Sequence, residues 1–156
     1  MIVRPQRILW PTDFSSLALH GARYARAFCE MFEAQMHVIH VVAPPITPDV
    51  SVSLATDVPS EYMDEEVLET CKRRLEELAA EQFPSIDVIR DVFYGHTWSG
   101  VCGYAERAEI ELIVVATHGR TGLRHVLIGS TAERIVQHAL CPVLVVKSSE
   151  KDFVVE

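Results

Sequence analysis

Basic residues are scarce in this sequence. Lysine and arginine number 14 among 156 residues, against 22 aspartates and glutamates, so the formal net charge is −8 at pH 7. Nucleic acids and anionic membranes are bound by broad basic faces, and we expect neither as a partner. No apolar run approaches the ~20 residues of a membrane span. The opening "MIVRPQRILWPTD" lacks the features of a secretory signal, so we expect a cytoplasmic protein.

Several sequence motifs are also missing. No G-x-x-x-x-G-K-[ST] is present and no G-x-G-x-x-G follows the first strand, which excludes a P-loop NTPase and argues against an ordinary dinucleotide fold. None of the four cysteines forms a C-x-x-C pair. Their apolar surroundings predict buried free thiols rather than disulfides or metal ligands. The cysteines are Cys29, Cys71, Cys102 and Cys141.

Short apolar runs alternate with amphipathic stretches along the whole chain. This alternation predicts an α/β fold: an open, doubly wound, five-stranded parallel sheet with helices on both faces. We expect a single domain over residues 1–156 with a loose tail over 148–156. The predicted strands are "RILWP", "QMHVIHVVAPP", "SIDVIRDVF", "ELIVVA" and "PVLVV".

Helical periodicity marks the predicted helices. In the first, apolar residues at helical spacing predict the buried face: Leu17, Gly21, Tyr24, Phe28 and Phe32. The second has an apolar side made of Leu68, Cys71, Leu75 and Leu78. "TWSGVCGYAERA" is a weaker helix because its two glycines lower helix propensity. "TAERIVQHAL" is the last helix, and the carboxylates of 64–66 are interpreted as a solvated helix face rather than a catalytic pair.

A glycine-rich loop, "ATHGRTGLRHVLIGST" (116–131), follows the fourth strand. It holds three glycines, two arginines and no acidic residue. Glycines allow a backbone to approach a ligand closely, and the N-terminus of the last helix attracts anions. In open parallel sheets, ligands bind beyond the carboxyl ends of strands. If the first and fourth strands are neighbours, Asp13 faces this loop, and together they predict a phosphate and sugar site.

Each of these residues also has an interpretation without a ligand. "STAE" (130–133) is a capping box, so Ser130 caps a helix, binds a ligand, or does both. Asp13 is placed to cap the first helix. Arg120 and Arg124 are either phosphate contacts or solvated loop charges, and the same two interpretations apply to His118. The combination favours the phosphate site.

At these residues the chain resembles the universal stress protein family. The resemblance covers about Arg7 to Lys147 and includes "ILWPTDFS", "HVIHVV", "LIVVATHGRTGLRHVLIGSTAERIV" and "CPVLVVK". The nucleotide-binding branch of that family carries G-x-x-G, nine residues, then G-[ST]. In this chain Gly119, Gly129 and Ser130 match the motif, whereas Ala116 replaces its first glycine.

The resemblance implies strand order 3-2-1-4-5 and a bound adenine nucleotide: ATP, or AMP or ADP, with Mg²⁺ held through the phosphates. Asp13 would hold the ribose, Val41 and Pro11 the adenine, and Gly129 the phosphates. The full set of implied contacts is Pro11, Thr12, Asp13, Val41, Val115, Ala116, Gly119, Arg120, Gly129, Ser130 and Thr131. No protein metal ligands are predicted.

The last strand, "PVLVV", is apolar and would lie at a sheet edge, which invites pairing with another chain. We expect a homodimer through antiparallel pairing of Val143 to Val146, as is typical of the family. The charges of the third strand protect the opposite edge. The alternative is that the C-terminal tail covers the last strand.

The histidines do not predict a metal site. His37 and His40, three apart on a strand, point to opposite faces and cannot share a metal ion. Trp98 is either a packing residue or a border of the binding cavity. We therefore predict a dimeric ATP-binding switch or sensor of the stress response, with an unknown protein partner and at most weak ATPase activity. The alternatives are a nucleotide-independent interaction module and a true hydrolase.

Overall fold

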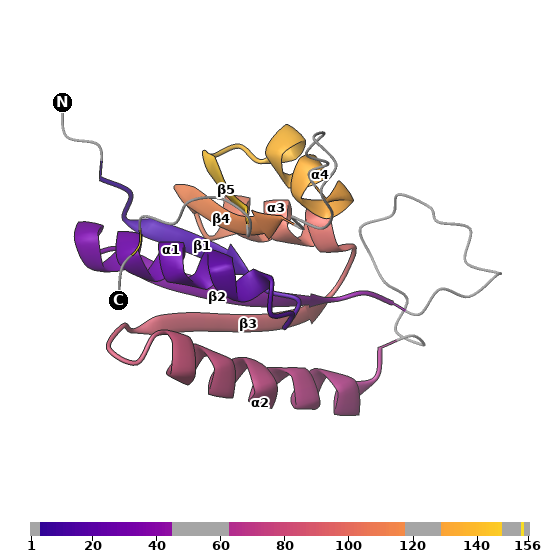
Figure 1. Ribbon diagram of the computed structural model, residues 1–156. Coiled ribbons are helices and arrows are strands. Elements are labelled where there is room, and N and C mark those ends of the chain that lie inside the picture. Colours follow the sequence, from indigo (N-terminus) through magenta and orange to yellow (C-terminus); the bar gives the residue numbers. More distant parts are fainter. Residues whose placement is uncertain (1–3, 45–62, 118–128, 148–153, 155–156) are drawn as a thin grey trace.

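The computed structural model describes residues 4–44, 63–117, 129–147 and 154. Its strands form one parallel sheet in the order β3-β2-β1-β4-β5 (Figure 1). The strands are β1 (Arg7–Pro11), β2 (Gln35–Val42), β3 (Val88–Tyr94), β4 (Leu112–Thr117) and β5 (Val143–Lys147). The predicted fold class and strand order are confirmed.

Helices cover both faces of this sheet, as expected for strands that are apolar on both sides. The helices are α1 (Ala18–Phe32), α2 (Glu65–Gln82), α3 (Thr97–Arg107) and α4 (Ser130–His138). Buried residues of α1 and α2 share one core cluster with the sheet, whereas those of α3 and α4 share the other (Figure 1). Among the described residues, no helix combines the length and apolarity that crossing a bilayer requires.

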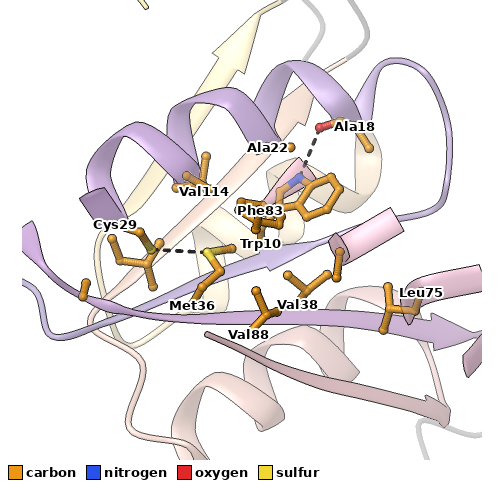
Figure 2. Close-up of a cluster of buried hydrophobic side chains, with 14 of the residues drawn as sticks. Trp10, Ala18, Ala22, Cys29, Met36, Val38, Leu75, Phe83, Val88 and Val114 are labelled. Carbon is orange, nitrogen blue, oxygen red and sulfur yellow. Dashed lines mark hydrogen bonds between the residues drawn. The ribbon is translucent and has the colours of Figure 1, made fainter. Parts of the chain in front are cut away.

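Trp10 of β1 is the centre of the α1–α2 core. Its side chain is fully buried, and its indole Nε1 donates a hydrogen bond to the Ala18 carbonyl at 3.1 Å (Figure 2). The Phe83 ring lies 5.7 Å away, measured between ring centroids. A buried tryptophan needs a partner for its N–H group, so this bond fixes where α1 begins relative to β1.

The buried face of α1 agrees with the prediction at Gly21 and differs from it elsewhere. Small residues face the sheet, and Tyr24, Phe28 and Phe32 lie partly exposed at the margin of the core. A β-carbon on Gly21 would lie 3.2 Å from Trp10 Nε1, so the helix approaches the sheet too closely for larger side chains. The buried residues of α1 are Ala18, Gly21, Ala22, Ala25 and Cys29.

The acidic residues that open α2 have a structural role. The Asp64 carboxylate accepts hydrogen bonds from the backbone N–H groups of Glu66 and Val67, at 2.9 and 3.4 Å. Acidic side chains in a first turn also stabilise the helix dipole. Residues 64–66 are all exposed, in agreement with their interpretation as helix-surface charges.

The four cysteines are free thiols, as predicted, but only Cys29 is buried. Burial, assisted by the nearby Glu30 charge, raises the pKa of Cys29 to about 12. The other three are partly exposed and pack against the margins of the two core clusters. The predicted loose tail falls outside the described residues except for Val154, whose carbonyl accepts a hydrogen bond from Arg23 Nη2 at 2.9 Å.

Candidate functional site

A cavity of about 370 Å³ lies at the carboxyl ends of β1, β2 and β4. β1 has β2 on one side and β4 on the other, so successive connections leave it in opposite directions. The two connecting segments diverge there and leave a crevice, which is where open α/β sheets bind ligands. The condition set by the sequence, that the first and fourth strands be neighbours, is met.

Most of the predicted contact residues line this single cavity. Gly119 and Arg120 lie outside the described residues, as do His118 and Arg124. Ala116, which replaces the first motif glycine, is half-buried at the cavity wall. The predicted residues that line the cavity are Pro11, Thr12, Asp13, Val41, Val115, Ala116, Gly129, Ser130 and Thr131.

One side of the cavity is apolar and belongs to the core under α3 and α4. Val41 and Val115 come from the ends of two strands, while Val101 and Ile135 come from the facing helices. Each is at most 7% exposed. Apolar walls with a few polar groups are typical of small-molecule sites, and this side suits a flat apolar group such as a nucleobase.

The opposite side is polar and begins at the turn after β1. Asp13 is exposed, and one of its carboxylate oxygens accepts a hydrogen bond from the Ser15 N–H at 2.9 Å. α1 begins only at Ala18, whose N–H group donates to the Ser15 hydroxyl at 3.2 Å, so the bond between Asp13 and Ser15 lies before the helix. It holds the Asp13 carboxylate in a tight Asx turn at the rim of the cavity.

His40 lies beside this turn and also lines the cavity. Its Nδ1 donates a hydrogen bond to the Thr12 carbonyl, 2.8 Å away. Burial lowers the pKa of His40 from its ordinary value of 6.5, while the Thr12 bond and the Asp13 charge oppose this shift and Arg74 adds to it. The imidazole is therefore neutral at pH 7.

The N-terminus of α4 forms the third wall. Gly129 is the N-cap, and no side chain caps the helix. The capping-box interpretation of Ser130 is therefore wrong: Ser130 is the first helical residue, and its side chain is exposed beside that of Thr131. The first N–H groups of a helix lack intrahelical partners and attract anions.

Sequence reasoning missed several cavity residues. His40 precedes the predicted Val41, and Ser15 follows the predicted Asp13, so the neighbours of motif residues were a usable signal. Val101 and Ile135 carry no such signal, because an apolar residue that faces a ligand looks the same in sequence as one that faces the core.

The remaining candidates lie elsewhere. His37 points to the α3 face, where its Nδ1 lies 2.9 Å from the Tyr104 hydroxyl, whereas His40 points to the α1 and α2 face, so the predicted opposition is confirmed. Trp98 packs against His138 and Arg134 on α4 rather than bordering the cavity. In the described part of the chain, no cluster of histidine, cysteine or acidic residues is suited to a metal ion.

Comparison with known proteins supports the resemblance. The model of the universal stress protein family matches residues 5–147. Universal stress protein MJ0531 of Methanocaldococcus jannaschii is 33% identical over 149 residues, which cover 94% of this chain and 85% of that protein.

Solved structures share the fold. That of MJ0577 from the same organism superposes with a TM-score of 0.72 and 25% identity, covering 96% of this chain and 100% of that one. A universal stress protein of Archaeoglobus fulgidus in complex with dAMP gives a TM-score of 0.62 at 16% identity, covering 93% and 98%.

Proposed function

The chain belongs to the universal stress protein family, and from that premise we propose that it binds an adenine nucleotide, ATP foremost, in the β1–β4 cavity. One observation carries the proposal. A carboxylate at Asp13 and an uncapped helix N-terminus at Ser130 line the same cavity, whose remaining wall is apolar. The dAMP complex of the Archaeoglobus relative supports an adenine ligand.

Each wall of the cavity suits one part of such a ligand. The apolar wall with Val41 and Pro11 receives the base, and Asp13 accepts hydrogen bonds from the ribose hydroxyls. Gly129, Ser130 and Thr131 offer backbone N–H groups to the phosphates. Mg²⁺ usually binds through phosphate oxygens and water, so we propose that it enters with the nucleotide rather than on protein ligands.

As for its role, we propose a nucleotide-dependent switch or sensor in the stress response. We do not propose efficient ATP hydrolysis, because the sequence identifies no general base that would activate an attacking water molecule. Ala116 favours a second candidate, an interaction module that binds no nucleotide, because its methyl group occupies space that a glycine would leave open.

Titration calorimetry with ATP and Mg²⁺ tests the binding proposal. Asp13→Ala is expected to weaken ATP binding about tenfold, since hydrogen bonds to a charged group contribute roughly 1.5–3 kcal/mol. Asp87→Ala removes an equal charge from an exposed residue next to the start of β3, outside the cavity lining, and should bind like wild type. If wild type does not bind ATP, the second candidate replaces the first.

We also propose that the protein is a homodimer paired through β5. This strand is a sheet edge, with Val143, Leu144 and Val145 only partly buried. The nearby Leu140 is 83% exposed. The opposite edge, β3, carries exposed charges that oppose such pairing.

A Val145→Lys variant is expected to be monomeric by sedimentation equilibrium, because a charge on the edge strand opposes pairing with a second chain. A wild type that is monomeric at tens of micromolar would contradict the pairing.

A further inference from the structure

The turn that carries Asp13 is tied to β2 at two points, both on Thr12. The last register pair of β1 and β2 is Pro11 with Ile39. Beyond it, the Thr12 N–H donates to the Ile39 carbonyl at 2.9 Å, while the Thr12 carbonyl accepts from His40 Nδ1 at 2.8 Å. The side chain of His40 thus replaces the next backbone bond of the ladder just where β1 leaves the sheet.

The second of these bonds acts directly on Asp13. The Thr12 carbonyl and the Asp13 nitrogen belong to one peptide group, which is planar. When His40 fixes the direction of that carbonyl, it also fixes the plane from which the Asp13 backbone departs. Thr12 itself is only 6% exposed, so its carbonyl depends on a protein partner such as His40 for its hydrogen bond.

The same imidazole supports the next residue. Phe14 has a φ of 62°, in the left-handed region that bulky residues rarely adopt. Its ring lies 4.3 Å from the His40 ring, and the Arg74 guanidinium lies 4.5 Å from the Phe14 ring centroid on the α2 side. Such strain persists only where surrounding contacts hold it. The Phe14 N–H also donates to the Thr12 hydroxyl at 3.0 Å.

The tautomer of the neutral His40 ring follows from its partner. A carbonyl oxygen only accepts hydrogen bonds, so Nδ1 carries the proton. The neutral ring therefore has its proton on Nδ1 and a lone pair on Nε2. This tautomer makes the bond to Thr12, and burial disfavours the charged ring, which lowers the pKa of His40.

We propose that His40 is the positioning residue for Asp13, and that its bond to the Thr12 carbonyl sets how well the site distinguishes a ligand with ribose hydroxyls from one without. The inference rests on the proposed adenine-nucleotide function. A residue that merely lines the cavity would affect the whole ligand. The effect of His40 is instead exerted through Asp13 and is confined to the part of the ligand that Asp13 binds.

The test compares ATP with 2′,3′-dideoxy-ATP, which keeps the adenine and phosphates but lacks both ribose hydroxyls. Wild type is expected to bind ATP more tightly. His40→Phe keeps a ring beside Phe14 and removes the donor. It is expected to weaken ATP about fivefold, as for one lost hydrogen bond, while dideoxy-ATP changes less than twofold. The ratio of the two affinities is the readout.

His40→Asn is the matched variant, because its amide nitrogen is the same number of bonds from the β-carbon as Nδ1. It is expected to retain most of the ATP preference. In the His40→Phe background, Asp13→Ala should cost little more, since the two residues act as one unit. If His40→Phe does not fold, His40→Leu, which also lacks a donor, takes its place.

The outcomes separate the inference from the function on which it rests. Failure of wild type to bind either nucleotide would remove the proposed function. Wild-type binding with equal loss of both ligands in His40→Phe would show that the ring merely supports the cavity, and would overturn the positioning role. A His40→Asn variant whose ATP preference falls to that of His40→Phe would also overturn it.

Discussion

Gly100→Ala is expected to be less stable than Gly103→Ala by about 1–3 kcal/mol, the usual cost of overpacking. Both residues lie in α3, and both substitutions gain the same helix propensity, roughly 1 kcal/mol. They differ in surroundings. A β-carbon on Gly100 would lie 3.0 Å from Val41 Cγ1 and 3.2 Å from Phe93, whereas one on Gly103 would meet only the flexible end of Arg107. Urea denaturation measures the difference.

The same pair of variants tests the apolar wall of the cavity. Phe93 is stacked on Tyr104, so it yields less readily than Val41, which borders open space. We expect Gly100→Ala to push Val41 into the cavity and to weaken ATP binding about tenfold, the affinity equivalent of ~1.4 kcal/mol. Gly103→Ala should bind like wild type. Equal stability and equal affinity of the two variants would mean that Val41 is not held against α3 as described.

The architecture was predictable because its signals are local. Apolar strands covered on both faces and amphipathic helices between them differ in period, and their alternation specifies a parallel doubly wound sheet. The edge position of "PVLVV" came only from the family resemblance, since strand order depends on contacts between segments far apart in the chain. Order β3-β2-β1-β4-β5 is what brings Asp13 to the same cavity as Ala116 and Gly129.

The buried face of α1 shows what helical periodicity alone cannot predict. Of the predicted stripe only Gly21 is buried, and small residues of the neighbouring stripe complete the face in contact with Trp10 and the sheet. Hydrophobicity ranks the large side chains first, whereas close packing of a helix on a sheet selects small ones. The choice depends on how closely the helix approaches Trp10 and Ala116, which the periodicity of the helix does not contain.

The site was predictable to the extent that it follows from strand ends. Asp13 and Ala116 are the residues at or just beyond the carboxyl ends of β1 and β4, so the topology brings them together. Ser130 was harder, since Ser-x-x-Glu predicts a capping box and the observed helix begins one residue earlier, with Gly129 as its N-cap. That shift leaves the Ser130 side chain exposed at the cavity instead of bound to its own helix.

Ser130→Glu is expected to separate stability from binding. An acidic residue in the first turn of α4 favours the helix dipole by about 0.3–1 kcal/mol, so the free energy of unfolding should hold or rise. The same charge would lie at the proposed phosphate site. Two like charges 5 Å apart near a protein surface repel by roughly 3 kcal/mol at an effective dielectric constant of 20, before screening by salt.

We therefore expect ATP affinity to fall at least thirtyfold in low salt, about 2 kcal/mol, and the loss to shrink as ionic strength rises. Ser130→Gln, similar in length but uncharged, should lose far less. Adenosine, which has no phosphate, should bind wild type and both variants alike by calorimetry. Equal weakening of ATP and adenosine in Ser130→Glu would show that the variant damages the cavity as a whole. Unchanged ATP affinity would place the phosphates away from the N-terminus of α4, because a negative charge on residue 130 would repel phosphates that are bound there.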